Sequence, residues 1–236
     1  MTNLRATAPL SKPASARAAL QRLRDAPLNF DLDRRNQYTP ATGWTLDHYR
    51  QMLPPEAPGA PLAHGSWAAC RRLMETYAFA DPAIVRALYD ADQPLAERDI
   101  LLEGRFYGLR FLLGLRVGDI QDDTVRIDER PARRWGWNYR TLRGHLEMGQ
   151  MDYSVLKWMD TGEVEFRIDA FSKAAHIPNP VVRLGFALFG RAMQRRFART
   201  ALRRMQHLVR DELVAVATGV DPLARRDLRP GGSGPA

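Results

Sequence analysis

The hydrophobic period of the chain changes from two to about 3.6 near residue 175, and this change limits the folds that it can adopt. Residues 101–170 are dominated by alternating apolar and polar side chains, the pattern of half-buried antiparallel strands. Residues 181–217 place apolar side chains every three or four positions, which predicts one amphipathic helix roughly 55 Å long. Strands followed by one long helix are typical of an α+β fold.

The individual strands of this region can be separated by their turns. The stretch from Leu101 to Val117 is expected to form a strongly bent strand pair, because glycine permits bulges and close backbone approach. Its glycines are assigned to one face, at positions 104, 108, 114 and 118. Three further strands are predicted over residues 135–139, 145–159 and 163–170. The tripeptide Asp160-Thr161-Gly162 indicates a hairpin between the last two.

Helices and irregular chain are expected before the sheet. Ser66 is a suitable N-cap for a helix over about residues 67–79. The pair Asp81-Pro82 is typical of a second helix start, and that helix is predicted to end near Asp92. Residues 29–65 are rich in proline and glycine, and we interpret them as an irregular segment that covers the core or serves the function.

The order of these elements predicts a helix-grip architecture, in which a bent antiparallel β-sheet is wrapped around a long C-terminal α-helix. Such a sheet cannot bury its concave face alone, and the helix over 181–217 is the element long enough to cover it. The single domain is assigned to residues 28–215. Residues 1–27 are interpreted as a mobile basic N-terminal extension, and residues 216–236 as a disordered C-terminal tail.

Composition narrows the class of protein. The single cysteine, Cys70, cannot form an internal disulfide, so a reducing cytoplasm is the expected location. No run of about 18 apolar residues is present to span a bilayer. The first 24 residues carry five cations and no acid, but they lack the apolar core of a signal peptide. A bacterial extension is therefore favoured over an organelle transit peptide.

The net charge of +8 suggests a nucleic acid or an anionic membrane as a partner. The cations comprise 32 arginines and three lysines, a bias that can reflect coding composition alone. An arginine ridge with spacing four runs along the predicted long helix, at positions 191, 195, 199 and 203. A solvated face is the simplest interpretation of this ridge, and contact with anionic lipid headgroups is the next. Nucleic acid is the least favoured, because no sequence-reading motif is present.

Three segments of the chain resemble an uncharacterised protein family. They read LLEGRFYGLRF over 101–111, WGWNYRTLRGHLEMGQMDYSVLKWMDTGEVEFR over 135–167 and NPVVRLGFALFGRAMQRRFAR over 179–199. The family is called domain of unknown function nineteen-ninety, it occurs in bacteria and plants, and the resemblance covers about residues 28–208. It is grouped with the START-like, birch-pollen-allergen-like superfamily.

This resemblance implies a helix-grip fold with a central cavity. Members of the superfamily bind sterols, lipids, polyketides or hormones there, and a minority are cyclases or hydrolases. The family has no established catalytic residues, so the resemblance assigns none to this chain. Because one fold hosts many functions, it implies a class of ligand rather than an activity.

The candidate ligand site combines an aromatic row with a polar spot. Trp135, Trp137 and Tyr139 alternate on one face, either as sheet core or as the wall of an apolar pocket. His145 and Glu147 are two residues apart and are expected on one strand face. There they would form a hydrogen-bonded pair, anchor a ligand, or act as an acid–base or metal-binding pair. The remaining ligand-binding candidates are Asn138, Phe166, Phe186 and Arg204.

The polar candidates define the functional alternatives. Arg204 is predicted on the apolar side of the long helix, so its charge needs a partner or a ligand anion. No catalytic motif is recognisable, and neither a metal nor a cofactor is expected. The favoured hypothesis is a cytoplasmic protein that binds a hydrophobic small molecule or lipid. The alternatives are a cavity enzyme of cyclase or hydrolase type that uses His145 and Glu147, and an Arg-rich module for anionic membranes.

Overall fold

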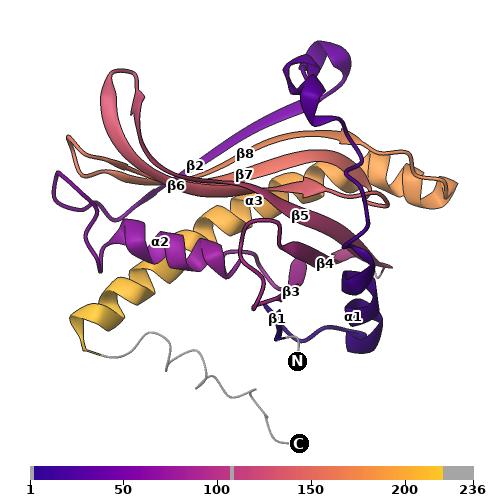
Figure 1. Cartoon of the computed structure of the whole chain (residues 1–236), viewed down its shortest axis with the longest axis horizontal. Helices are drawn as coiled ribbons and strands as arrows, with labels where there is room; N and C mark the ends of the chain where they lie inside the picture. The colour runs from indigo at the N-terminus through magenta and orange to yellow at the C-terminus, as the bar shows by residue number, and fades with distance from the viewer. Residues whose placement is uncertain (1–2, 107–108, 220–236) are drawn as a thin grey trace, which may run out of the picture.

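The computed structural model describes residues 3–106 and 109–219 and shows one antiparallel sheet with helices packed against it (Figure 1). Within these residues the sheet has eight strands, in the order β1-β3-β4-β5-β6-β7-β8-β2. The strands are β1 (Leu4–Ala6), β2 (Thr45–Leu53), β3 (Val85–Asp90), β4 (Asp99–Phe106), β5 (Leu109–Ile127), β6 (Arg130–Thr141), β7 (Glu147–Trp158) and β8 (Val164–Ala174). The helices are α1 (Pro13–Arg22), α2 (Ser66–Glu75) and α3 (Pro180–Ala217), with 3₁₀ turns η1 (Leu32–Gln37) and η2 (Pro40–Thr42).

The sheet curves over α3, which runs beneath its concave face (Figure 1). The start of α3 is fixed locally, because the side-chain oxygen of Asn179 accepts hydrogen bonds from Val181 N and Val182 N at 2.9 and 3.1 Å. The helix α2 packs beside the C-terminal half of α3, where Arg72 pairs with Glu212 at 3.0 Å. The predicted helix-grip fold is therefore confirmed, and so is the span of its long helix.

The main core lies between the concave face of the sheet and the two covering helices. Alternate side chains of β6, β7 and β8 point into it, among them Trp137, Tyr153 and Phe166. Residues of α2 and of the C-terminal half of α3 meet them from the other side. Each large apolar side chain buried in this way contributes about 1.5–3 kcal/mol to stability, so this half of the concave face is a major part of what holds the domain together.

The helix predicted after Asp81-Pro82 is wrong, since these residues form a turn that leads into β3. Ala83 N donates to the Asp81 side chain at 2.8 Å and Ile84 N to the Asp81 carbonyl at 2.9 Å, which completes one turn only. From Val85 onward the backbone pairs with β4. The preceding helix α2 also ends early, at Glu75, because Tyr77 adopts a left-handed φ of 56°.

The segment over residues 29–65, interpreted as irregular, contains the strand β2. This strand pairs with β8 along its whole length, from Thr45 opposite Ser172 to Leu53 opposite Val164. Its apolar side chains are divided between the two faces: Tyr49 and Leu53 point inward, while Leu46 and Met52 are exposed. Strand pairing rather than one-sided hydrophobicity therefore holds β2 in the sheet.

The N-terminal residues differ from the expected mobile extension. The short strand β1 pairs with β3, and α1 buries Ala16 and Leu20 in a small apolar cluster with Leu101. Arg116 of β5 holds the end of this segment by donating hydrogen bonds to the carbonyls of Leu23, Arg24 and Ala26. The fold thus begins before residue 28. The expected tail over 216–236 falls mostly outside the described residues.

The prediction that the glycines of the strand pair β4–β5 share one face is wrong, because the structure places them on both faces. Gly104 is opposite Phe111 and faces the concave side with Leu113, whereas Gly114 faces the convex side. A Cβ on Gly114 would lie 2.5 Å from Leu23, so glycine here lets α1 approach the sheet closely. Gly118 shares that side, and position 108 lies outside the described residues.

Candidate ligand-binding cavity

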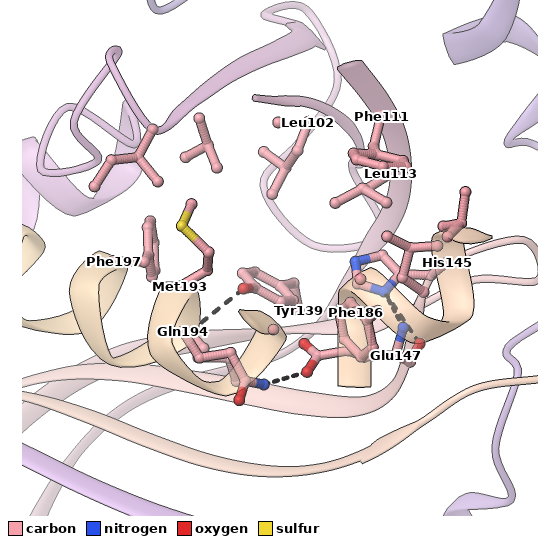
Figure 2. A pocket seen from close by; sticks show the side chains of 18 of the residues that line it. Leu102, Phe111, Leu113, Tyr139, His145, Glu147, Phe186, Met193, Gln194 and Phe197 are labelled. Carbon is pink, nitrogen blue, oxygen red and sulfur yellow. Dashed lines mark hydrogen bonds between the residues drawn. The ribbon is translucent and has the colours of Figure 1, made fainter. Parts of the chain in front are cut away.

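A cavity of about 190 Å³ lies between the N-terminal half of α3 and the strands β3 to β7 (Figure 2). Its walls are almost entirely apolar, and four of the lining side chains are polar: Tyr139, His145, Glu147 and Gln194. The remaining lining residues are Ile84, Val85, Leu102, Gly104, Phe111, Leu113, Leu146, Met151, Val181, Val182, Gly185, Phe186, Gly190, Met193 and Phe197.

Two glycines that line the cavity leave space in its walls. A Cβ placed on Gly185 of α3 would meet no atom within 4 Å, and one on Gly104 of β4 would meet only Leu113 Cδ1 at 3.8 Å. Close packing with few voids is the rule in protein interiors. Larger side chains at these two positions would fill space that the present sequence keeps open.

Glu147, the first residue of β7, directs its carboxyl group to one end of the cavity (Figure 2). Gln194 of α3 donates a hydrogen bond from Nε2 to Glu147 Oε1, and a second one to Ser172 Oγ at 3.2 Å. Burial raises the pKa of Glu147 to about 7, although the Gln194 hydrogen bond and the nearby charge of Arg191 act against this rise. The group is therefore a mixture of carboxylic acid and carboxylate near neutral pH.

His145 lies in the β6–β7 connection, and its ring contacts the backbone of Glu147 rather than the carboxyl group. Glu147 N donates to His145 Nδ1 at 2.9 Å. The carbonyl oxygen of Glu147 also lies 3.0 Å from Nδ1, so this nitrogen accepts from the amide in one tautomer of the neutral ring and donates to the carbonyl in the other. Burial lowers the pKa of His145 to about 4, so the ring is neutral at physiological pH.

The hydroxyl of Tyr139 adds a further hydrogen-bonding group beside the carboxyl of Glu147 (Figure 2). Its oxygen lies 3.4 Å from Met151 Sδ, which also accepts from Tyr153 at 3.1 Å. Burial raises the pKa of Tyr139 to about 12, so the phenol is neutral. A thioether is a weak acceptor, and the Tyr139 hydroxyl can therefore donate to a ligand oxygen as well.

A second cavity of about 40 Å³ adjoins the first on the side of β2 and β8. Tyr139, His145, Glu147, Met151 and Gln194 line both cavities. An ion pair between Arg191 of α3 and Asp47 of β2 lies beside this smaller space and connects the helix to the edge of the sheet. The polar residues among these therefore lie between the larger, apolar cavity and the smaller one.

The sequence comparison identifies the family. Residues 29–204, more than half of the chain, match the family described as Domain of unknown function (DUF1990). The chain belongs to this family. The comparison with curated proteins gives no match.

Solved structures similar to this DUF1990 protein share little sequence with it. The crystal structure of Ara h 8.0201 is 9% identical with a TM-score of 0.40, covering 71% of this chain and 98% of its own. Protein CV1439 from Chromobacterium violaceum is 13% identical with a TM-score of 0.37, covering 70% of this chain and 96% of its own. An uncharacterised protein from Rhizobium leguminosarum is 10% identical with a TM-score of 0.30, covering 71% and 97%.

Four of the nine residues expected at the ligand site of this DUF1990 protein line the cavity: Tyr139, His145, Glu147 and Phe186. Trp135, Trp137 and Phe166 do not, because α2 and the residues after it cover that half of the concave face. The Phe79 ring lies 5.5 Å from that of Phe166, and the Tyr77 ring 6.1 Å from that of Trp137. These three residues belong to the filled core.

The other two expected residues also lie away from the cavity. Asn138 alternates with Trp137 and Tyr139 and therefore faces the convex side, next to its cross-strand neighbour Asp152. Arg204 donates a hydrogen bond from Nε to the carbonyl of Ala78 at 2.9 Å, so its partner is the chain after α2 rather than a ligand anion.

Several cavity residues were not singled out from the sequence, notably Leu102, Leu113, Met193 and Gln194. The apolar members have no signal that separates them from ordinary core residues. Gln194 is a polar residue within the apolar stripe of α3, and this contrast is the one local feature that could have indicated it. Across the described residues, no group of three or more His, Cys, Asp or Glu side chains is placed to hold a metal ion.

Proposed function

We propose that this DUF1990 protein binds a hydrophobic small molecule or lipid in the cavity beneath the N-terminal half of α3. The observation that carries the proposal is the composition of the cavity wall, which is apolar except for one end. Ligand pockets are typically apolar with a few polar groups that fix orientation. Glu147, Tyr139 and His145 supply such groups here.

The volume limits the part of a ligand that can enter. A cavity of roughly 150 Å³ lined by aliphatic and aromatic side chains accepts a benzene ring, whereas sites for drug-sized ligands are roughly 300–1,000 Å³. The observed volume of about 190 Å³ suits one ring or a short alkyl chain. A whole sterol would require α3 to move away from β4 and β5.

The polar end favours a ligand that carries an oxygen-containing group. The Tyr139 hydroxyl is a donor, the free ring nitrogen of His145 donates or accepts according to its tautomer, and Glu147 does so according to its protonation state. An apolar molecule with a hydroxyl, carbonyl or carboxyl group at one end satisfies these atoms. The rest of the molecule would remove water from the apolar wall, which supplies the main binding energy.

The test is native mass spectrometry of the purified protein, followed by thermal unfolding with the molecule that is found. A ligand at 100 times its dissociation constant adds about 2.7 kcal/mol to the free energy of unfolding. The variant Gly185→Leu fills the cavity and should abolish both the added mass and the shift in melting temperature. Ala187→Leu is the matched control, because Ala187 is exposed on the same helix. Equal retention of ligand by both variants would exclude this cavity as the site.

The cavity-enzyme alternative relied on an acid–base pair formed by the side chains of His145 and Glu147. The ring of His145 binds the Glu147 backbone, so the two side chains do not form an acid–base pair. In the described part of the chain, no helix is both long and apolar enough to cross a bilayer. A cytoplasmic location stays a prediction.

A further inference from the structure

The first three turns of α3 expose large aliphatic side chains to solvent. Val181, Leu184 and Leu188 are 74%, 61% and 64% exposed. Their spacing of three and four residues places them on one side of the helix. Single exposed aliphatic residues are common on protein surfaces, but a group on one helix face indicates a contact surface.

The same side of α3 continues as a row of arginines. Arg195, Arg199 and Arg203 follow at spacing four, and all three are exposed. At 3.6 residues per turn these arginines and the three aliphatic residues fall within a sector of roughly 100°. None of the three makes an ion pair or a side-chain hydrogen bond with the described residues, whereas Arg191 is paired with Asp47. We call these six residues the outer face of α3.

The outer face lies directly behind the cavity. Val182 and Phe186 of the same turns line the cavity from the other side of the helix, and Val181 and Gly185 border it at the edge of the outer face. One stretch of helix therefore separates an apolar interior space from solvent and carries apolar side chains on both sides. A ligand that enters past α3 from outside would pass this segment.

We propose that the outer face of α3 docks on an anionic membrane surface. An amphipathic segment with aliphatic residues and arginines binds such a surface by burying the former at the acyl boundary and pairing the latter with phosphate groups. In such a complex the aliphatic residues and the arginines of the outer face would both contact the membrane. The proposal goes beyond ligand binding and does not depend on whether the cavity is occupied.

The composition of the outer face favours a membrane over the other partners. A nucleic-acid surface is bound through phosphate contacts, which leave three exposed aliphatic side chains without a role. A second copy of the chain would bring one row of arginines close to another or to the remaining positive surface, and like charges oppose such a contact. The net charge of +8 has the sign that an anionic leaflet attracts.

The experiment measures co-sedimentation of the full chain with vesicles of phosphatidylcholine alone and of phosphatidylcholine with phosphatidylserine. We expect binding only to the anionic vesicles, with an affinity that falls as salt is added. The triple variant Arg195→Gln, Arg199→Gln, Arg203→Gln should lose about 100-fold in affinity, since each cation near an anionic surface contributes about fivefold. The matched control is Arg17→Gln, Arg22→Gln, Arg24→Gln, which removes the same charge from exposed positions on and after α1 and should change affinity by less than about threefold.

A second pair of variants tests the aliphatic residues. Leu184→Ser with Leu188→Ser should weaken vesicle binding by at least about tenfold, because two aliphatic side chains no longer enter the lipid. Leu62→Ser with Met52→Ser removes two exposed apolar residues elsewhere and should have no effect. Thermal melts confirm that each variant is folded.

Three results would overturn the proposal. The first is equal binding to neutral and anionic vesicles, or binding that is lost equally in both arginine triples. The second is an arginine-dependent affinity for duplex DNA without vesicle binding. The third is a dimer in analytical ultracentrifugation that the Leu184 and Leu188 changes dissociate, again without vesicle binding.

Discussion

Lys157 Nζ lies 2.8 Å from Glu56 Oε2, and the two side chains form an ion pair that is almost fully removed from solvent. The other oxygen of Glu56 accepts a hydrogen bond from Trp67 N at 2.8 Å, in the first turn of α2. Glu56 therefore caps this helix in place of Ser66, whose buried hydroxyl has no partner among the described residues. One carboxylate connects the loop after β2, the strand β7 and the start of α2.

This arrangement predicts a large effect for Lys157→Met. The change leaves the Glu56 carboxylate buried without its cation, which costs about 3–5 kcal/mol when one partner of a buried pair is removed. Urea unfolding followed by tryptophan fluorescence would measure the loss. The double variant Lys157→Met, Glu56→Gln should recover part of it, because no charge is then left unpaired. A loss below about 1 kcal/mol in the single variant would contradict the buried pair.

Glu147 should make the protein less stable as the pH rises. Burial raises its pKa from 4.5 to about 7, so between these values the folded state binds more protons than the unfolded state. The free energy of unfolding therefore falls with pH over this range, by up to about 3 kcal/mol. Glu147→Gln should remove this fall, which urea titrations across the pH range would reveal.

His145 should have the opposite effect over nearly the same range. Burial lowers its pKa from 6.5 to about 4, so between these values the unfolded state binds more protons. Its contribution makes the free energy of unfolding rise with pH, again by up to about 3 kcal/mol. Burial also raises the pKa of Asp152 to about 6, which adds a fall that the wild type and both variants share. Relative to the wild type, the free energy of unfolding should therefore rise with pH in Glu147→Gln and fall in His145→Gln. Identical profiles for the two variants would refute this assignment.

Two aromatic truncations should separate the cavity from the filled core. Phe197 is buried and lines the cavity, so Phe197→Ala should cost about 3–5 kcal/mol and also enlarge the ligand space. Trp137→Ala should cost a similar amount without changing ligand preference, because Trp137 packs between Tyr77 and Tyr153 outside the cavity. Thermal shift with a panel of apolar ligands of graded size would distinguish them. A change of preference in Trp137→Ala would place the ligand elsewhere.

The docking of α1 predicts resistance to proteolysis. Arg17, Arg22 and Arg24 are exposed trypsin sites, but the backbone around them is helical or held by Arg116. Trypsin should therefore cut these bonds only as the domain unfolds. Arg116→Gln removes donors to three carbonyls and should allow early cleavage there. Rapid cleavage of the wild type at Arg17 would restore the interpretation of a mobile extension.

The sequence predicted the parts of the fold that have a strong local period. The helix α3 has regular apolar spacing and a capping Asn179-Pro180 start, and β7 and β8 are separated by a clear turn. The strand β3 was misassigned because its apolar residues fit either period and the Asp81-Pro82 signal favoured a helix. Pairing with β4 decides the outcome, and such pairing joins residues distant in sequence.

The candidate site could be predicted only in part, again because contacts between residues distant in sequence decide which residues line the cavity. His145 and Glu147 stand out as polar residues beside sheet positions, and they do line the cavity. The aromatic residues of β6 and β8 were expected beside them, but which part of the concave face stays open depends on where α2 packs. Nothing in the local sequence of Trp135 or Phe166 contains that information.

The strand order has a consequence for synthesis. Both edge strands, β1 and β2, come from the first 53 residues, and Thr45 of β2 pairs with Ser172 of β8. A ribosome adding roughly 5–20 residues per second would release β2 on the order of ten seconds before its partner exists. During this interval the strand is exposed with both backbone edges unpaired, and its mixed sequence, with Asp47, His48 and Arg50, gives it charges that discourage pairing with another chain.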